Sequence, residues 1–247
     1  MSQDAPLFFL LGGTGGIGSE TARILSGNGY RVALAARDGS KLDALASEVN
    51  AVGTHAIDAT DADAVTEAVK ACIEANGPLY GAANFAGSII LKPAHATKLE
   101  EWHETMNLNL HTSFHLVQAV IRGMMKTGGS VLFCSSVVAR TGFAAHEAVA
   151  AAKAGVEGLM LAAAASYASK GVRFNCIAPG LTDTPMAKPI TGSDAALKAS
   201  QDMQPTGRIG TAGEAARAAA YLLDPANEHT TGVTLGVDGG LGRVKAK

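Results

Sequence analysis

A glycine-rich turn near the start of the chain has the residue types that bind phosphate. Residues 11–18 read LGGTGGIG, after an apolar run and before a helical pattern. Gly12 would permit the tight turn, Gly16 would let the backbone approach a pyrophosphate, and Gly18 would let the helix pack on the sheet. The helix N-terminus would add free N–H groups and positive potential. A glycine-rich connection without a ligand is the alternative, but the strand–turn–helix context favours a dinucleotide site.

The end of the second apolar run indicates which dinucleotide would bind. Sites for NAD usually place an acid there to bind the ribose hydroxyls, whereas this chain has Ala36 followed by Arg37. A guanidinium suits the 2′-phosphate of NADP. The alternative is that Arg37 is an exposed loop residue and that Asp38 only caps the next helix. These residues favour NADP over NAD as the cofactor.

The elements that would position these residues alternate along the chain. We expect strands over 7–11, 31–36, 53–57, 79–84, 130–135, 173–177 and 233–237, and helices over 17–28, 40–49, 62–75, 100–125, 148–169 and 212–223. Buried strands that alternate with helices predict a parallel sheet covered on both faces. The fold class is therefore α/β: one doubly wound, Rossmann-type domain over residues 1–247, with a mobile excursion at about 182–204.

Composition excludes several classes of protein. The 20 Lys and Arg against 22 Asp and Glu leave a formal charge of −2, which gives no electrostatic reason to expect nucleic acid or an anionic membrane as a partner. The apolar run that begins at Pro6 is too short to span a bilayer, and Asp4 precedes it where a signal peptide carries positive charge. The cysteines Cys72, Cys134 and Cys176 are far apart and odd in number. We expect buried, reduced thiols and a cytoplasmic protein.

Several motifs in the right order resemble the short-chain dehydrogenase/reductase family over nearly the whole chain. Residues 11–18 are similar to its TGxxxGIG turn with Leu11 in place of Thr, residues 84–87 to its NNAG segment, residues 173–180 to its PG motif and residues 232–240 to its C-terminal signature. The turn and the resemblance together imply cofactor contacts from Gly12, Thr14, Gly16, Ile17, Gly18, Arg37, Asp58, Ala59, Asn84, Ala86, Gly87, Lys153, Pro179, Gly180, Thr182 and Thr184. The resemblance also implies a small-molecule substrate and a homodimer or homotetramer.

The family's catalytic set is Asn, Ser, Tyr and Lys. By resemblance, Asn109, Ser136 and Lys153 match three of these residues, with separations of 27 and 17 positions. The tyrosine would stand four residues before the lysine, where this chain has Val149. Valine has no proton to exchange with a carbonyl oxygen. Lys153 could still bind the nicotinamide ribose, as the resemblance implies.

His146 is the candidate for the missing proton donor. It stands seven residues before Lys153, so it would share that helix face if the helix begins early enough. Imidazole exchanges protons near neutral pH. Glu147 is the rival, but its spacing points to another face, and it suits a helix start. The alternative is that His146 is a loop or helix-start residue without a chemical role.

These observations predict an oxidoreductase that transfers hydride between NADP and a carbonyl/alcohol pair with an atypical proton donor. Two alternatives remain open: a non-catalytic NADP-binding sensor or partner subunit, which Val149 favours, and a reductase of C=C bonds. The 182–204 segment resembles the family's substrate loop, and its apolar residues would close over a ligand. His111 and His115 are spaced as zinc ligands, but no third ligand is evident, so we expect no metal.

Overall fold

The computed structural model describes residues 4–245 and confirms the predicted α/β class. Seven parallel strands form one sheet in the order β3-β2-β1-β4-β5-β6-β9. Their bounds are β1 (Leu7–Leu11), β2 (Arg31–Ala36), β3 (Gly53–Ala56), β4 (Gly81–Asn84), β5 (Gly129–Cys134), β6 (Val172–Pro179) and β9 (Thr234–Val237). A second small sheet pairs β7 (Thr182–Asp183) with β8 (Gly210–Thr211). The result is the doubly wound arrangement that the alternating pattern predicts.

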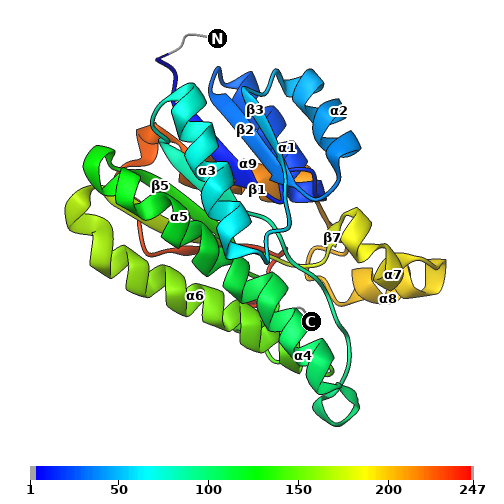
Figure 1. Cartoon of the computed structure of the whole chain (residues 1–247). Coiled ribbons are helices and arrows are strands. Elements are labelled where there is room, and N and C mark those ends of the chain that lie inside the picture. Colours follow the sequence, from blue (N-terminus) through cyan, green and yellow to red (C-terminus); the bar gives the residue numbers. More distant parts are fainter. Residues whose placement is uncertain (1–3, 246–247) are drawn as a thin grey trace.

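Helices cover both faces of the large sheet (Figure 1). Those of the chain are α1 (Gly16–Gly27), α2 (Gly39–Val49), α3 (Ala62–Asn76), α4 (Leu99–Met106), α5 (Thr112–Thr127), α6 (Glu147–Tyr167), α7 (Lys188–Thr191), α8 (Asp194–Asp202) and α9 (Ala212–Leu223). Apolar residues of α3, α5 and α6 join one buried cluster, and those of α1, α2 and α9 join the other.

Alternation along β1 explains why the core has two layers. Phe8 and Leu10 lie in the cluster with α1 and α9, while Phe9 and Leu11 lie in the cluster with α3 and α5. Successive side chains of a strand point to opposite faces, so a strand buried on both faces must be apolar at every position. Each residue of β1 is at most 1% exposed.

The strand order reverses between β1 and β4, and this reversal positions the candidate site. β1 pairs with β2 on one side and with β4 on the other, so the connections that leave the two central strands turn to opposite sides. The crevice between these connections lies at the carboxyl ends of the strands, where doubly wound sheets bind their ligands. The residue after β4, Phe85, donates its N–H to the carbonyl oxygen of Leu11 at 2.8 Å, which holds the two strand ends together.

The helix predicted over 100–125 is not one uninterrupted α-helix. α4 ends at Met106, a π-helical turn spans Asn107–His111, and α5 then begins at Thr112. The amide nitrogen of the Asn109 side chain donates to the carbonyl oxygen of Thr105 at 3.0 Å, within the turn that the bulge widens. Such π turns are frequent at functional sites, and this one carries a predicted site residue.

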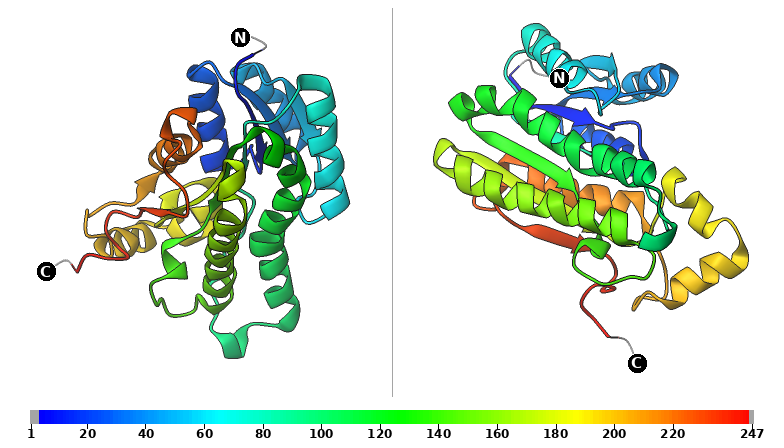
Figure 2. Two further views of the ribbon diagram at one scale, coloured as in Figure 1. Left: turned by 90° about the vertical axis from the view of Figure 1, so that its left-hand side faces the viewer. Right: turned by 60° about the horizontal axis from the view of Figure 1, so that its bottom comes forward.

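The segment 182–204, predicted as an irregular excursion, contains regular structure. A 3-10 turn over Pro185–Ala187 leads into α7, and α8 follows. Figure 2 shows these two helices projecting from the body of the molecule. Their weak periodicity has a physical reason: no residue of α7 or α8 is buried, so neither helix needs an apolar stripe that faces a core.

One helix of the described residues is long and apolar enough to cross a membrane. It spans Glu147–Lys170, and half of its most apolar window is buried inside the protein. Val156, Met160 and Ala163 of this helix lie in the core cluster against β6. Its apolar composition therefore reflects packing on the sheet.

Arg173 of β6 provides the first testable prediction. Its guanidinium is 6% exposed and donates to the carbonyl oxygens of Leu222, Leu223, Asp224 and Thr230 at 2.8–3.4 Å. It therefore satisfies the free carbonyls at the C-terminus of α9. Arg173→Met should lower the free energy of unfolding by about 3 kcal/mol, because the carbonyl oxygens of Leu223 and Asp224 lose their donor. Those of Leu222 and Thr230 keep bonds from Ser130 and Asn175. Urea unfolding would measure the loss, and the exposed Arg122→Met should change stability by less than about 0.5 kcal/mol.

Candidate functional site

A cleft of about 670 Å³ opens at the carboxyl ends of β1, β4, β5 and β6. Every residue that the sequence singled out as a candidate site residue lines this cleft, except Asn84. The cleft has two ends that differ in chemistry. Arg37, Lys41 and Asp58 lie at one end, and Ser136, His146 and Lys153 lie at the other.

The glycine-rich turn has the geometry that phosphate binding requires. Gly12 has a φ of +73°, and a Cβ there would lie 2.6 Å from the backbone nitrogen of Ala86. A Cβ on Gly18 would lie 2.5 Å from the carbonyl oxygen of Gly12, so this glycine packs α1 against the turn itself. Within residues 4–245, no acceptor takes the amide protons of Gly16, Ile17 and Gly18. These free N–H groups at a helix start suit an anionic ligand.

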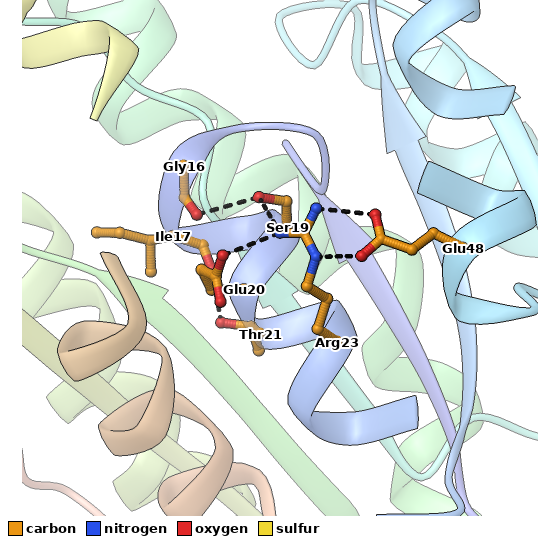
Figure 3. Close-up of polar contacts among 7 residues, drawn as sticks. All are labelled: Gly16, Ile17, Ser19, Glu20, Thr21, Arg23 and Glu48. Atoms are coloured by element: carbon orange, nitrogen blue, oxygen red, sulfur yellow. Dashed lines mark hydrogen bonds and ion pairs between the residues drawn. The ribbon is translucent and has the colours of Figure 1, made fainter. Parts of the chain in front are cut away.

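Polar contacts fix the first turns of α1 (Figure 3). The Ser19 hydroxyl donates to the carbonyl oxygen of Gly16 at 3.2 Å. The Arg23 guanidinium forms a two-pronged pair with Glu48 of α2 at 2.6 and 2.9 Å and also donates to Glu20. Arg23 therefore holds α1 against α2. A phosphate at this helix would be bound by the backbone N–H groups and the helix dipole.

The end of the cleft at β2 and β3, where we expect the adenosine half of a dinucleotide and which we call the adenosine end, carries two cations. Arg37 follows β2 and is exposed, and Lys41 in the first turn of α2 lines the cleft beside it. Asp38 caps α2, because its carboxylate accepts from the backbone N–H of Lys41 at 3.2 Å and from the Ser40 hydroxyl at 2.7 Å. These bonds lower the pKa of Asp38 to about 2. The end of the cleft therefore combines a capping carboxylate with two positive side chains.

Sequence reasoning missed Lys41 at this end. Its ammonium lies 3.2 Å from the Asp38 carboxylate and its side chain reaches the cleft. Its spacing was the available signal: Lys41 stands one helical turn after Asp38, the residue that follows Arg37.

Asp58 and Ala59 follow β3 and line the same end of the cleft. One carboxylate oxygen of Asp58 accepts from the backbone N–H and the hydroxyl of Thr60 at 2.9 and 2.8 Å. These bonds, with a smaller contribution from the Arg37 charge, lower the pKa of Asp58. The other carboxylate oxygen of Asp58 can still accept a hydrogen bond.

Asn84 does not line the cleft, because its side chain points into the protein. Its amide nitrogen donates to the hydroxyls of Thr112 and Ser113 at 2.9 and 3.0 Å, and its oxygen accepts from the N–H of Ala86 at 2.9 Å. Asn84 therefore ties β4 to the start of α5. Ala86 and Gly87, which follow it, do line the cleft.

Asn109 holds the next part of the same loop. Its side-chain oxygen accepts from the N–H of Ser88 at 3.1 Å, and its nitrogen donates to the Ser88 hydroxyl and to the Thr105 carbonyl, both at 3.0 Å. A Cβ on Gly87 would lie 2.9 Å from that oxygen and 3.4 Å from Nζ of Lys153. Asn109 therefore keeps Gly87 close to the Lys153 ammonium.

Lys153 projects from the middle of α6 and is 7% exposed. Its Nζ donates to the carbonyl oxygen of Cys134, the last residue of β5, at 2.7 Å. Burial lowers the pKa of the Lys153 ammonium. Two further N–H bonds of the ammonium stay available to a ligand in the cleft. We expected Cys134 to be buried, but it is partly exposed. The reason is that it is the last residue of β5 and borders the cleft.

Ser136 and Val149 both line the cleft. The Ser136 oxygen accepts from the N–H of Val138 at 3.4 Å and begins a 3-10 turn. Its hydroxyl proton is therefore free to donate to a substrate oxygen. Val149 is 4% exposed and lines the cleft one turn before Lys153. Its methyl groups offer contact surface where a phenol would offer a proton.

His146 lines the cleft but stands just outside α6, as its N-cap residue. Its Nδ1 donates to the carbonyl oxygen of Ala144 at 2.8 Å, and its ring lies 5.6 Å from that of Phe143. The carbonyl can only accept, so Nδ1 carries a proton and Nε2 is the nitrogen free to exchange one. The preceding residue, Ala145, has a φ of +62°, which an alanine adopts only under strain.

The strained turn before His146 provides the second prediction. Ala145→Gly should raise the free energy of unfolding by about 1 kcal/mol, because glycine adopts a positive φ without a Cβ clash. Thermal unfolding would measure this gain. Ala144→Gly is the matched control: its backbone has no positive φ, so it should not stabilise the protein. Equal effects from both substitutions would contradict the assignment of strain to Ala145.

Sequence reasoning also missed a buried carboxylate beside the cleft. Glu157, one turn after Lys153, is 7% exposed. It accepts from the Ser135 hydroxyl at 2.8 Å and pairs with the Arg140 guanidinium. These bonds fasten the end of β5 and the following 3-10 turn to α6, on both sides of Ser136. Helical spacing from Lys153 was the only signal that could have indicated this role.

Comparisons with known proteins agree with this geometry. The family model for enoyl-(acyl carrier protein) reductase matches residues 12–242. The 3-oxoacyl-[acyl-carrier-protein] reductase of Vibrio cholerae is 34% identical over 98% of this chain and 99% of its own. The galactitol 2-dehydrogenase of Cereibacter sphaeroides is 35% identical over 93% of this chain and 92% of its own.

Solved structures show the same fold. A variant of actinorhodin polyketide ketoreductase, crystallised with NADPH, superposes with a TM-score of 0.94 at 27% identity, over 98% of this chain and 99% of that one. The chain belongs to the short-chain dehydrogenase/reductase family. It is an oxidoreductase with a Rossmann-type fold of the kind that binds nicotinamide cofactors.

Proposed function

We propose that the protein transfers hydride between NADP and a carbonyl/alcohol substrate, with His146 in place of the family tyrosine. The observation that carries this proposal is the single cleft that joins the free N–H groups of α1 to Ser136, His146 and Lys153. The cradle of glycines, the two cations at the adenosine end and the polar groups at the other end fit a nicotinamide dinucleotide phosphate.

Each candidate residue has a distinct task in this proposal. The bound nicotinamide would supply or accept the hydride. Ser136 donates a hydrogen bond to the substrate oxygen and orients it. Nε2 of His146 gives a proton to that oxygen in the reductive direction or removes it in the oxidative direction. Lys153 binds the nicotinamide ribose with the N–H bonds that Cys134 leaves free, and Asn109 positions Gly87 beside it.

Arg37 should select NADP, which is the third prediction. Arg37→Ser should weaken NADPH binding by about 30-fold, because the 2′-phosphate loses a charge-assisted hydrogen bond. NADH binding should change by less than about 2-fold, since the 2′-hydroxyl makes no use of that charge. Fluorescence titration of both cofactors would check this. Equal losses for NADPH and NADH would show that Arg37 shapes the turn and does not read the phosphate.

The reaction itself is tested with labelled cofactor. We would incubate the protein with NADPH that carries deuterium at C4 and with a panel of ketones, aldehydes, quinones and enones. Label at a carbinol carbon supports the proposal, whereas label at the β-carbon of an enone supports reduction of C=C bonds. Binding of NADPH without transfer to any acceptor would support the non-catalytic alternative that Val149 favours. As the family resemblance implies, we further propose a cytoplasmic homodimer or homotetramer, which sedimentation analysis would check.

A further inference from the structure

The end of the cleft that holds Ser136, His146 and Lys153, here called the substrate end, has an apolar opening. Ile89, Leu91, Met186 and Met203 line the cleft and are between 40% and 55% exposed. We call these four residues the apolar rim. Single exposed apolar residues are common, but four around one opening that also holds buried polar groups are typical of a ligand site.

Contacts between distant segments bring Leu241 and the segment after Met203 together at the substrate end. A Cβ on Gly242 would lie 2.9 Å from Val137, and the Thr141 hydroxyl donates to the Gly242 carbonyl at 3.3 Å. These contacts place Leu241, which lines the cleft, beside the turn that follows Ser136. A Cβ on Gly240 would lie 3.7 Å from Pro205, which brings the segment after Met203 to the same place.

The loop that carries Ile89 and Leu91 is fixed at both of its ends. Ser88 is bonded to Asn109 at 3.0 and 3.1 Å. The N–H of Ala94 donates to the Glu147 carboxylate at the start of α6 at 3.3 Å. The loop therefore passes from the Lys153 side of the cleft to the His146 side.

Four of the cations near this end are paired with carboxylates. Lys92 pairs with Glu101, Lys188 with Asp183 at 3.0 Å, and Lys198 with Asp202. Arg140 pairs with Glu157. Within residues 4–245, the Lys and Arg side chains that line the cleft are Arg37 and Lys41 at the adenosine end and Lys153, which is bonded to Cys134. A carboxylate or phosphate on the substrate would lose water and meet only the Lys153 ammonium, whose remaining N–H bonds the proposed function assigns to the nicotinamide ribose.

We propose that the substrate is a neutral carbonyl compound with a largely hydrocarbon body, such as an alicyclic or aryl ketone. This inference rests on the proposed function, because it assigns the substrate of the same cleft. Val149 adds to the apolar surface at the substrate end, since it presents methyl groups where a tyrosine would present a hydroxyl. The carbonyl oxygen lies toward Ser136 and His146, and the hydrocarbon body lies against Val149, Leu241 and the apolar rim.

A matched pair of ketones tests this inference without requiring turnover. We would titrate 4-tert-butylcyclohexanone and 4-oxocyclohexanecarboxylate into the full-length protein saturated with NADP⁺, with calorimetry as the readout. The neutral ketone should bind at least about 30-fold more tightly, because the carboxylate must be desolvated without a partner. Equal or tighter binding of the carboxylate would overturn the inference, and so would binding of neither ketone.

Charge placed on the rim should reverse the preference. Met203→Lys should strengthen binding of the carboxylate by about 10-fold and weaken that of the neutral ketone, since an ammonium then faces the ligand. Met125→Lys is the matched control: Met125 is 37% exposed on α5 and does not line the cleft, so the ratio of affinities should not change. A ratio that Met203→Lys leaves unchanged would place the ligand away from the rim and contradict the inference.

The two proposals fail in different ways. Binding of the neutral ketone without deuteride transfer supports the ligand class and contradicts the proposed reaction. Transfer to a charged acceptor with no transfer to the neutral ketone supports the reaction and contradicts the ligand class. If NADP⁺ itself does not bind, the cofactor part of the proposed function fails, and the same titration without cofactor still decides between the two ketones.

Discussion

Val149→Tyr should raise turnover of a ketone substrate by up to about 100-fold over the wild-type protein, because general acid catalysis by a positioned side chain spans roughly 10²–10⁴-fold and His146 is expected to supply only about 100-fold of it. Val149 lines the cleft one helical turn before Lys153, so a phenol there would point toward the substrate oxygen. The Lys153 ammonium would favour the ionised phenol and improve it as a proton carrier.

Val149→Phe is the matched control for this substitution. It adds the same ring without the hydroxyl, so it should give no gain in turnover. Stopped-flow measurement of NADPH oxidation with both variants would separate proton donation from a change in cleft shape. An equal rise with Phe and Tyr would mean that ring packing, and not acid catalysis, limits the wild-type protein. No rise with Tyr would show that the other candidate residues do not form a competent site.

His146→Ala should lower turnover by about 100-fold while the affinity for NADPH stays within about 2-fold. The imidazole has its Nδ1 bonded to the Ala144 carbonyl, so Nε2 is the atom that the proposal needs. Glu147→Gln is the control, since Glu147 bonds the Ala94 N–H and does not line the cleft.

The two substitutions should interact when combined. In a Val149→Tyr background the phenol supplies the proton, so His146→Ala should then cost less than about 3-fold in turnover, and the effects should be strongly non-additive. The same loss from His146→Ala in both backgrounds would contradict the proposal, because it would assign His146 to substrate binding or to the local fold.

Local patterns in the sequence predicted most of the cofactor half of the cleft. The strand–turn–helix order around residues 11–18, and the end of β2 at Ala36 and Arg37, each lie within a single βαβ unit. Phosphate binding depends on backbone N–H groups at a helix start, so a short run of residues carries its own geometry. The proposed preference for NADP rests on the same short stretch of residues, although Lys41 was missed.

The substrate half could be predicted only in part. The family resemblance pointed to Ser136 and Lys153, and the structure brings both to one cleft. The roles of Asn84 and Asn109 could not be inferred, because each depends on which distant groups their amides meet: Thr112 and Ser113 for Asn84, and Ser88 for Asn109. The π turn that carries Asn109 has the same apolar periodicity as an ordinary helix and was therefore missed.

The sequence by itself determined the doubly wound fold, the phosphate turn and the absence of a tyrosine four residues before Lys153. These features depend on periodicity, residue type and spacing over short stretches of chain. The tertiary structure alone decided that Glu157 fastens Ser135 and Arg140, that His146 stands at the N-terminus of α6 in the lining of the cleft, and that Lys92 pairs with Glu101. Such contacts join residues far apart in the chain, and the free energy of burying and pairing charges depends on the neighbours that only the folded chain provides.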